Sequence, residues 1–204
     1  MTKIKICGIT NYDDAKNAID LGADFLGFNF YNKSQRYVDY KIAKNIIRKI
    51  TGKARAVGVF VNDEIWRIEK ISNYCNLDLI QLSGDETNNF IIKLKKKIDK
   101  KIIKCFHIKN LSDINNIKNF GYDYIMLDSF KEGFYGGTGK SFELNSLRDM
   151  DTKKLFLAGG MNKDNVRITI QKLNPYAIDV CSSIESSHGK KDYNKMKHFI
   201  EAVK

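Results

Sequence analysis

Residues 56–61 read Ala56-Val57-Gly58-Val59-Phe60-Val61, a short run that is apolar at every position. The side chains of a strand point alternately to its two faces, so this run predicts a strand that is buried on both faces. Parallel strands covered by helices have this pattern, because each connection between them carries a helix across the sheet. The stretch therefore predicts a parallel sheet in an α/β protein.

Similar runs recur along the whole chain. They begin near eight residues: Lys3, Phe25, Ala56, Leu77, Ile102, Tyr124, Lys154 and Ala177. The spacing is about 25 residues, which suits a strand, a loop and a helix. An open sheet of eight strands would leave edges to protect, so the repeat favours a closed (β/α)8 TIM barrel with parallel strands. The helical pattern around Leu111 to Phe120 is the weakest of the eight.

Three helices can be recognised from the sequence, two between these runs and one at the end of the chain. Asn11 is a cap for the first, and Gly22 ends it. A second follows Asn162 and ends at Asn174-Pro175, because the residue before a proline disfavours the helical conformation. The apolar stripe of the first helix is Ala15, Ala18 and Ile19, and that of the second is Val166, Ile170 and Leu173. The stripe of the last helix is Tyr193, Met196, Phe199, Ile200 and Val203.

Composition excludes several classes of protein. Pro175 is the only proline and there is no Gly/Ser-rich linker, so residues 1–204 are predicted to form one domain. The net charge of +11 peaks in the run Lys93–Lys101, where Phe90, Leu94 and Ile98 form the apolar stripe of a helix with a solvated lysine face. We therefore expect no nucleic-acid partner. The pattern leaves open whether the chain is a monomer or a homodimer.

The cysteines and the chain start indicate a cytoplasmic protein. Cys7, Cys75, Cys105 and Cys181 form no CxxC pair, and the three histidines have no zinc-ligand spacing, so we expect reduced thiols and no metal. No apolar run approaches the ~20 residues that span a bilayer, and the start lacks the apolar segment of a signal peptide. We expect no membrane association.

In a barrel of this kind the active site lies at the carboxyl ends of the strands. Polar residues after the seventh and eighth runs, Gly159-Gly160 and Ser182-Ser183, predict a phosphate site, because glycines let backbone N–H groups approach an anion. An ordinary tight turn is the alternative for the glycine pair. The remaining polar residues at this end are Asn29–Arg36, Asn62-Asp63, Gln81, residues 136–140 and Asp179.

Cys7 and Asp128 end apolar strands and form a candidate acid–base pair. A thiolate can remove a carbon-bound proton, and a protonated aspartic acid can deliver one to an oxygen. Arg36, after the second strand, can bind a carboxylate through two parallel hydrogen bonds. The structural alternatives are a small buried hydrophobe for Cys7, a hydrogen-bonded carboxylate for Asp128 and a surface arginine for Arg36. The residues alone do not assign the roles.

Motifs along essentially the whole chain resemble those of the phosphoribosylanthranilate isomerases. The opening Lys5-Ile6-Cys7-Gly8-Ile9-Thr10 and the later Gly136-Gly137-Thr138-Gly139-Lys140 are the most specific of them. The resemblance continues, in order, through residues 22–28, 33–37, 57–62, 80–82, 127–128, 158–162, the segment around Asp179 and residues 188–192.

The resemblance implies a cofactor-free Amadori rearrangement in tryptophan biosynthesis. Cys7 resembles the base that removes the C2′ proton, Asp128 the acid that protonates the ribose ring oxygen, and Arg36 the group that holds the anthranilate carboxylate. No cofactor is implied, because the nitrogen of the substrate stabilises the intermediate. The implied phosphate-binding set consists of Gly137, Gly139, Gly159, Gly160, Ser182 and Ser183, and Asp179 completes the substrate-binding residues.

The chain departs from the family pattern at several positions. Ser83 stands where a histidine is common, Asn32 where proline is usual, and residues 142–144 read Phe-Glu-Leu. Ile184 stands where the family pattern has a glycine. A β-branched residue disfavours positive φ, so we expect a reshaped eighth loop. None of these changes affects Cys7, Asp128 or Arg36.

Three other functions are weighed against this one. A histidine-biosynthesis barrel would carry an aspartate where Cys7 stands, and indole-glycerol-phosphate synthase usually has a longer N-terminus. A nucleic-acid-binding module would gather Lys and Arg on one face. A barrel without activity that only binds a phosphorylated ligand is disfavoured by the intact set of Cys7, Asp128 and Arg36.

Overall fold

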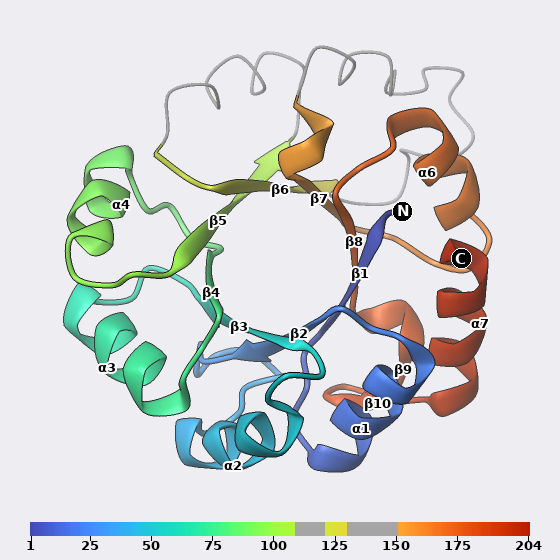
Figure 1. The fold of residues 1–204 in the computed structure, drawn as a ribbon, viewed down its shortest axis with the longest axis horizontal. Coiled ribbons are helices and arrows are strands. Elements are labelled where there is room, and N and C mark those ends of the chain that lie inside the picture. The colour runs from blue at the N-terminus through green and yellow to red at the C-terminus, as the bar shows by residue number, and fades with distance from the viewer. Residues whose placement is uncertain (109–120, 130–150) are drawn as a thin grey trace.

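The computed structural model describes residues 1–108, 121–129 and 151–204, in which a ring of parallel strands is surrounded by helices (Figure 1). The strands pair in chain order and β1 pairs with β8, so the barrel is closed. Each strand begins within two residues of its predicted start, which confirms the predicted barrel. They are β1 (Lys3–Cys7), β2 (Phe25–Asn29), β3 (Arg55–Phe60), β4 (Leu79–Leu82), β5 (Lys101–Ile108), β6 (Tyr124–Ser129), β7 (Leu155–Ala158) and β8 (Ala177–Val180).

The helices lie outside the barrel (Figure 1). They are α1 (Tyr12–Leu21), α2 (Tyr40–Ile50), α3 (Ile65–Cys75), α4 (Asn88–Lys95), α6 (Val166–Leu173) and α7 (Tyr193–Val203), with 3-10 turns η3 (Thr152–Lys154) and η4 (Ser182–Ile184). The start and end of α1 are as predicted: Asn11 accepts the backbone N–H of Asp14 at 2.8 Å, and Gly22 follows in the left-handed conformation with φ 104°. No helix in the described part of the chain is long and apolar enough to cross a membrane.

One helix prediction needs correction. Helix α4 ends at Lys95, so Ile98 lies beyond it, and Ile91 and Leu94 are the buried side chains of the helix. Lys93, Lys95, Lys96 and Lys97 are exposed, as predicted, whereas Lys100 is half-buried. The cap of α6 is Asn165, while Asn162 accepts backbone N–H groups in the turn before it. The segment from Leu111 to Phe120 lies outside the described residues.

The apolar side chains form two layers. The outer layer lies between the strands and the helices and includes Ile6, Leu26 and Phe60. The inner layer fills the barrel and consists of Phe25, Val57, Leu79, Ile103, Cys105, Met126, Phe156, Ala158 and Ala177, with Tyr124 and Tyr176 against it. The run at residues 56–61 contributes Ala56 to the outer layer and Val57 to the inner one, which confirms that it is buried on both faces.

Aromatic rings close the amino-terminal end of the barrel interior. Phe25 and Phe156 meet edge to face with centroids 5.3 Å apart, and Tyr124 stacks on Tyr176 at 5.0 Å. Tyr124 and Tyr176 precede or begin their strands, so the rings lie at that end. The cationic groups of Arg55 and Lys101 lie over the Phe25 and Tyr124 rings, 5.3 and 5.7 Å from their centroids.

An aspartate precedes each of three even-numbered strands and binds the strand before it. Asp24, Asp78 and Asp123 accept the backbone N–H groups of Ile4, Ala56 and Ile102 at 2.9, 2.7 and 2.9 Å. These contacts fix the beginnings of β1, β3 and β5 relative to their neighbours. Charged side chains at the amino-terminal end therefore hold the strands in register.

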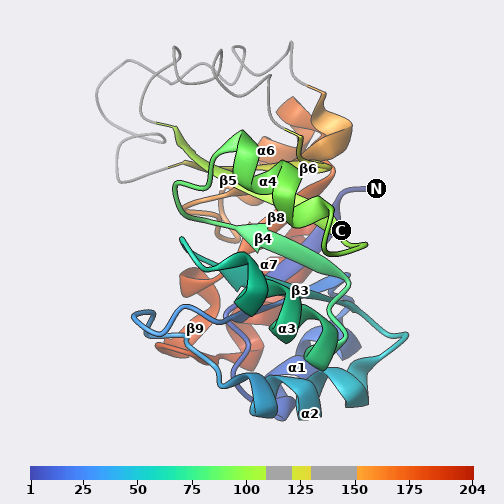
Figure 2. The same ribbon diagram turned by 90° about the vertical axis from the view of Figure 1, so that its left-hand side faces the viewer.

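The two ends of the barrel are distinct in the side view (Figure 2). The N-terminus lies at one end, and a small hairpin of β9 (Glu185–Ser187) and β10 (Lys190–Lys191) follows the carboxyl end of β8 at the other. The hairpin packs on the first loop and α1: Thr10 donates to the Gly189 carbonyl at 2.5 Å, and Asp14 accepts the backbone N–H of Lys191 at 2.8 Å.

Candidate active site

The two predicted catalytic residues lie at the carboxyl end of the barrel. Cys7 is the last residue of β1, and Asp128 lies one residue before the end of β6; both are half-buried. Met126 belongs to the inner layer, so Asp128, two residues further along the strand, faces the same side. Cys7 lies opposite Gly27 in the pairing of β1 with β2. A thiol and a carboxyl group therefore line the same end of the barrel.

Cys7 lies in a positively charged environment. A hydrogen bond with the Cys181 thiol and the charges of Lys5 and Lys191 hold the pKa of Cys7 well below its ordinary value, although burial opposes them. The hydrogen bond with Cys7, together with burial, raises the pKa of Cys181, so that thiol keeps its proton. Cys7 is thus the thiol of this end that ionises first, as a general base requires.

Below Cys7 on the same strand, Lys5 forms a buried ion pair with Asp179. Lys5 Nζ lies 2.7 Å from Asp179 Oδ1, and the two side chains are 0% and 10% exposed. Burial would lower the pKa of Lys5, but the Asp179 carboxylate raises it above its ordinary value. Burial raises the pKa of Asp179 to about 7 despite the opposing charge of Lys5. Asp179, which was predicted from its place after the last strand, therefore faces the interior beside Cys7.

Two glycines make room for these groups. A Cβ on Gly27 would lie 2.8 Å from Cys7 Sγ and 3.1 Å from Lys5 Nζ. Gly8 has φ 77°, and a Cβ there would lie 2.9 Å from Cδ of Arg36. The signature after Cys7 therefore contains glycine both for the backbone turn and for the close approach of Arg36.

Arg36 is already bound to an internal carboxylate. Its Nε donates to Glu185 Oε1 at 2.9 Å and its Nη2 donates to Glu185 Oε2 at 2.7 Å. Nη2 also lies 3.3 Å from His188 Nδ1. Nη1 has no partner among the residues that the structure describes. The guanidinium of Arg36 is therefore held at Nε and Nη2 by Glu185 and His188, and Nη1 faces the rest of the site.

Glu185 joins Arg36 to the hairpin. Its Oε1 accepts from Lys191 Nζ at 3.0 Å and from the Gly189 backbone N–H at 3.3 Å. Burial would raise the pKa of Glu185, but the hydrogen bonds from Arg36 and Lys191 lower it from 4.5 to about 2. The carboxylate is therefore charged at neutral pH and fixes the position of Arg36.

The loops after β7 and β8 meet, as the phosphate-site prediction requires. Gly159 and Gly160 have φ values of 81° and 61°, and Ser183 Oγ donates to the Met161 carbonyl at 2.6 Å. Ser182 and Ser183 are exposed to solvent. Two loops with small polar residues thus form one surface beside Cys7 and Cys181.

At Ile184, where we expected a reshaped loop, the backbone is not left-handed. Among the described non-glycine residues, positive φ occurs only at Asn62, Asn76 and Asn174. Ile184 ends the 3-10 turn η4, and its side chain is 1% exposed in the outer apolar layer. The position takes a β-branched residue because the backbone does not need a left-handed conformation there.

The predicted site also includes glycines of the loop after β6 and Gln81 on β4. Gly137, Gly139 and the rest of residues 130–150 lie outside the described residues. Gln81 is buried, and its Nε2 donates to Ser83 Oγ at 2.9 Å, where the family pattern has a histidine. Gln81 Oε1 is buried with no hydrogen-bond partner in the described part of the chain.

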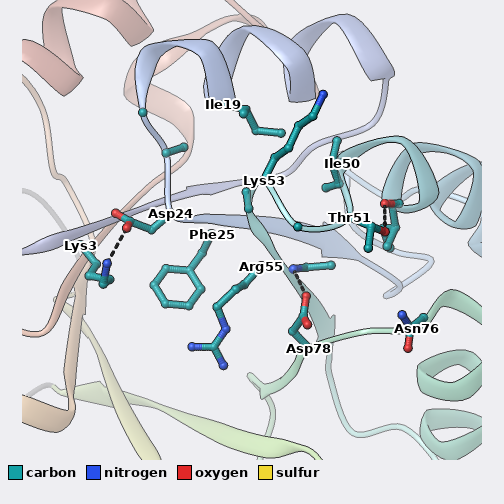
Figure 3. A pocket seen from close by; sticks show the side chains of 16 residues that line it. Lys3, Ile19, Asp24, Phe25, Ile50, Thr51, Lys53, Arg55, Asn76 and Asp78 are labelled. Atoms are coloured by element: carbon teal, nitrogen blue, oxygen red, sulfur yellow. Dashed lines mark hydrogen bonds and ion pairs between the residues drawn. The ribbon is translucent and has the colours of Figure 1, made fainter.

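A hollow of about 430 Å³ lies at the opposite, amino-terminal end of the barrel (Figure 3). It lies between the ends of α1 and α2 and the beginnings of β2 and β3, and Lys3, Asp24, Arg55 and Asp78 are among its lining residues. Its two carboxylates hold backbone N–H groups of β1 and β3. The hollow is separated from Cys7 by the aromatic rings of the inner layer, so it is no part of the candidate site.

Sequence reasoning missed Lys5, Lys191 and Glu185 as site residues. Their partners are far away in the chain: Arg36 and Glu185 are 149 residues apart, and Lys5 and Asp179 are 174 apart. One local signal was available, because Lys5 lies two residues before Cys7 on a strand and must share its face. A lysine on an inward face is a buried charge that needs a partner.

Comparisons with known proteins identify the family of this chain. The family described as N-(5′-phosphoribosyl)anthranilate (PRA) isomerase matches residues 4–202 of this chain. An N-(5′-phosphoribosyl)anthranilate isomerase from Bacillus cereus (strain ATCC 14579) is 42% identical over 204 residues, which are 98% of each chain.

Solved structures of the same family have the same fold. The phosphoribosylanthranilate isomerase from Thermotoga maritima is 36% identical with a TM-score of 0.86, over 100% of this chain and 98% of that one. A phosphoribosylanthranilate isomerase in complex with reduced 1-(o-carboxyphenylamino)-1-deoxyribulose 5-phosphate is 33% identical with a TM-score of 0.85 and the same coverage.

Proposed function

The chain belongs to the N-(5′-phosphoribosyl)anthranilate isomerase family, and from this premise we propose how its residues carry out the reaction. The enzyme converts N-(5-phosphoribosyl)anthranilate to 1-(2-carboxyphenylamino)-1-deoxyribulose 5-phosphate in tryptophan biosynthesis. In this Amadori rearrangement the ribose ring opens to a Schiff base and the C2′ proton leaves to give an enolamine. The ketoamine forms as C1′ gains a proton and the C2′ hydroxyl loses one. The chain must therefore supply an acid for the ring oxygen and a base for C2′.

Cys7 is the proposed base. The observation that carries this assignment is the position of its thiol between Lys5, Lys191 and the Cys181 thiol at the carboxyl end of β1. These groups favour the thiolate, which takes the proton from C2′ and leaves the bonding electrons to the C1′–C2′ bond of an enol. Because the anthranilate nitrogen accepts the displaced electron pair, no cofactor is proposed.

Asp128 is the proposed acid. It faces the barrel interior from β6, so it reaches the substrate from another part of the ring of strands than Cys7. Its carboxyl group donates a proton to the ribose ring oxygen as the C1′–O bond breaks. Separate strands thus place the acid and the base around the same sugar.

Arg36 is the proposed site for the anthranilate carboxylate. A guanidinium has five N–H donors on two usable edges. Glu185 occupies the edge formed by Nε and Nη2. The substrate carboxylate would bind Nη1, and would bind Nη2 in place of His188, while Glu185 would keep the guanidinium aimed at the site.

The proposed phosphate site consists of the loops after β7 and β8. Gly159 and Gly160 present backbone N–H groups, and Ser182 and Ser183 add exposed hydroxyl groups. Gly137 and Gly139, outside the described residues, remain part of the proposal. Asp179 contributes to substrate binding through its place at the end of β8.

We further propose that residues 1–204 form one catalytic domain, which works in the cytoplasm as a monomer or a homodimer. The pairing of β1 with β8 supports the single domain, because these strands come from opposite ends of the chain. The four cysteines are free thiols in the structure, as in proteins of a reducing compartment. The exposed lysines of α4 support a small substrate over nucleic acid, because they lie on a solvated helix face.

The assignment of the base is tested with Cys7→Ser. Serine is close to cysteine in size but does not ionise at neutral pH, so we expect kcat to fall by about two orders of magnitude or more. The measurement is the loss of substrate fluorescence, with phosphoribosylanthranilate generated in situ. The matched control is Cys75→Ser on α3, where the new hydroxyl can donate to the Tyr40 carbonyl that Cys75 now contacts at 3.2 Å. Parent-like turnover of Cys7→Ser would remove Cys7 from this role.

A further inference from the structure

Lys5 is a fully buried cation inside the barrel. Its side chain is 0% exposed, and its Nζ lies 2.7 Å from Asp179 Oδ1 on the neighbouring strand β8. Burying a charge is costly even when it is paired, and a pair of apolar residues would fill the same space at lower cost. The pair is therefore poorly explained as a source of stability. Its position suggests a role at the site.

The Lys5 amine and the Cys7 thiol share one small space. Both side chains leave β1 on the inward face, two residues apart. A Cβ on Gly27 of β2 would lie 3.1 Å from Lys5 Nζ and 2.8 Å from Cys7 Sγ, so both atoms border the same point. Gly27 leaves that point empty, which lets the ammonium group approach the sulfur.

We propose that Lys5 is a positioning residue for Cys7: its ammonium group, anchored by Asp179, holds Cys7 as a thiolate at the carboxyl end of the barrel. Lys5 does not touch the substrate in this arrangement, and it acts through the sulfur. The inference rests on the proposed role of Cys7 as the base.

The other cations near Cys7 are both paired with one carboxylate. Lys191 is 3.0 Å from Glu185, and Arg36 is bound to the same carboxylate, so the charge of Glu185 offsets theirs. Lys5 is offset by Asp179, whose pKa burial raises to about 7. The titratable groups that surround the pair are Cys105 on β5, Asp128 on β6, and Cys181, Lys191 and Arg36 around Cys7.

The experiment measures the ionisation of Cys7 directly. The rate of Cys7 alkylation by iodoacetamide is followed from pH 5 to pH 10 by mass spectrometry of the peptide that contains Cys7. The proteins compared are the parent, Lys5→Met, Asp179→Asn and the control Lys3→Met. Lys3 lies on the same strand in an ion pair of the same length, 2.7 Å, but at the other end of the barrel.

We expect Lys5→Met to move the pH midpoint of alkylation upward by about one unit or more, as loss of an adjacent opposite charge does. At pH 7.5 its kcat should fall about tenfold and recover as the pH is raised, with KM changed less than about twofold. Asp179→Asn should move the midpoint downward, because it removes a negative charge and leaves the ammonium group of Lys5 to Cys7 alone. Lys3→Met should match the parent.

A midpoint unchanged in Lys5→Met would overturn the proposal. If Lys5→Met does not fold, the double variant Lys5→Met/Asp179→Asn, which leaves no unpaired buried charge, is compared with Asp179→Asn. The proposal predicts a higher midpoint in the double variant than in Asp179→Asn, and equal midpoints would overturn it. Alkylation reports on Lys5 whether or not Cys7 is the base. Failure of the catalytic assignment, seen with Cys7→Ser, is therefore distinguishable from failure of this one.

Discussion

The two lysines of β1 form ion pairs of the same length at opposite ends of the barrel. Lys3 and Asp24 lie 2.7 Å apart with side chains 45% and 31% exposed, and Lys5 and Asp179 lie 2.7 Å apart with side chains 0% and 10% exposed. The first pair is solvated and contributes little to stability. The second is enclosed, so its charges act strongly on their neighbours. Position within the barrel, rather than the contact itself, decides what the pair does.

Other ion pairs at the two ends of the barrel differ in exposure in the same way. At the amino-terminal end Lys95 and Asp123 are 35% and 31% exposed. Near the carboxyl ends of the strands Lys104 and Glu86 are 3% and 1% exposed, and Lys191 and Glu185 are 0% and 5% exposed. Charges at the first end hold strand beginnings, whereas these two pairs near the second end are buried beside the loops after β3, β4 and β8.

The largest expected effect is that of Lys104→Met, which leaves the buried Glu86 carboxylate without its cation. Glu86 also accepts the backbone N–H groups of Asn62 and Gly84, at 2.8 and 3.0 Å, so the loops after β3 and β4 depend on it. We expect the free energy of unfolding, measured in urea, to fall by about 3–5 kcal/mol. The control Lys95→Met should cost less than about 1 kcal/mol. Equal losses would show that burial does not separate the two pairs.

An intermediate, pH-dependent effect is expected for Glu185→Gln. The pKa of Glu185 is lowered to about 2 in the folded protein, so its charge stabilises the fold above the ordinary value of 4.5, and this contribution is lost as the pH falls toward 2. At pH 7 we expect the variant to be less stable than the parent by about 1–3 kcal/mol. The difference should shrink at lower pH.

Urea unfolding at pH 7, 4 and 3 measures this difference. The control is Asp20→Asn, which removes an ion pair with Lys16 whose side chains are both 56% exposed, and which should change little at any of these values. A difference for Glu185→Gln that stays constant from pH 7 to pH 3 would mean that the charge of Glu185 is not what stabilises Arg36 and the hairpin.

The smallest effect is expected for Lys3→Met. We expect a loss of less than about 1 kcal/mol in the free energy of unfolding, and less again at about 1 M salt, where exposed charges are screened. Turnover should equal that of the parent, because the aromatic layer separates Lys3 from the site. A loss of turnover comparable to that of Lys5→Met would show that the exposed and the buried lysine of β1 do not differ in their effect on the site.

Most of the fold was predictable from the chain alone. Apolar runs such as residues 56–61 are buried on both faces because helices cover the outside and side chains fill the inside. Capping residues such as Asn11 and Gly22 act within a few positions, so they too were predictable. The end of α4 was not, since the apolar pattern continues to Ile98 although the helix stops at Lys95.

The candidate site was predictable only in part. The ends of the strands placed Cys7, Asp128 and the loops after β7 and β8 in one region, and the resemblance to a family supplied their roles. The engagement of Arg36 by Glu185 was not predictable, because its donors and acceptors come from loops after β2 and β8. The roles of Cys7, Asp128 and Arg36 remain predictions for the variants above to test.

The sequence by itself determined the repeated unit, the parallel strands and the end of the barrel that carries polar residues. These depend on side-chain periodicity and local capping, whose physical range is a few residues. Only the tertiary structure decided which charges become partners, that Lys5 is enclosed beside Cys7, and that Lys3 is solvated. The physical reason is that burial and electrostatic coupling depend on distances in space, and closing the barrel joins residues from opposite ends of the chain.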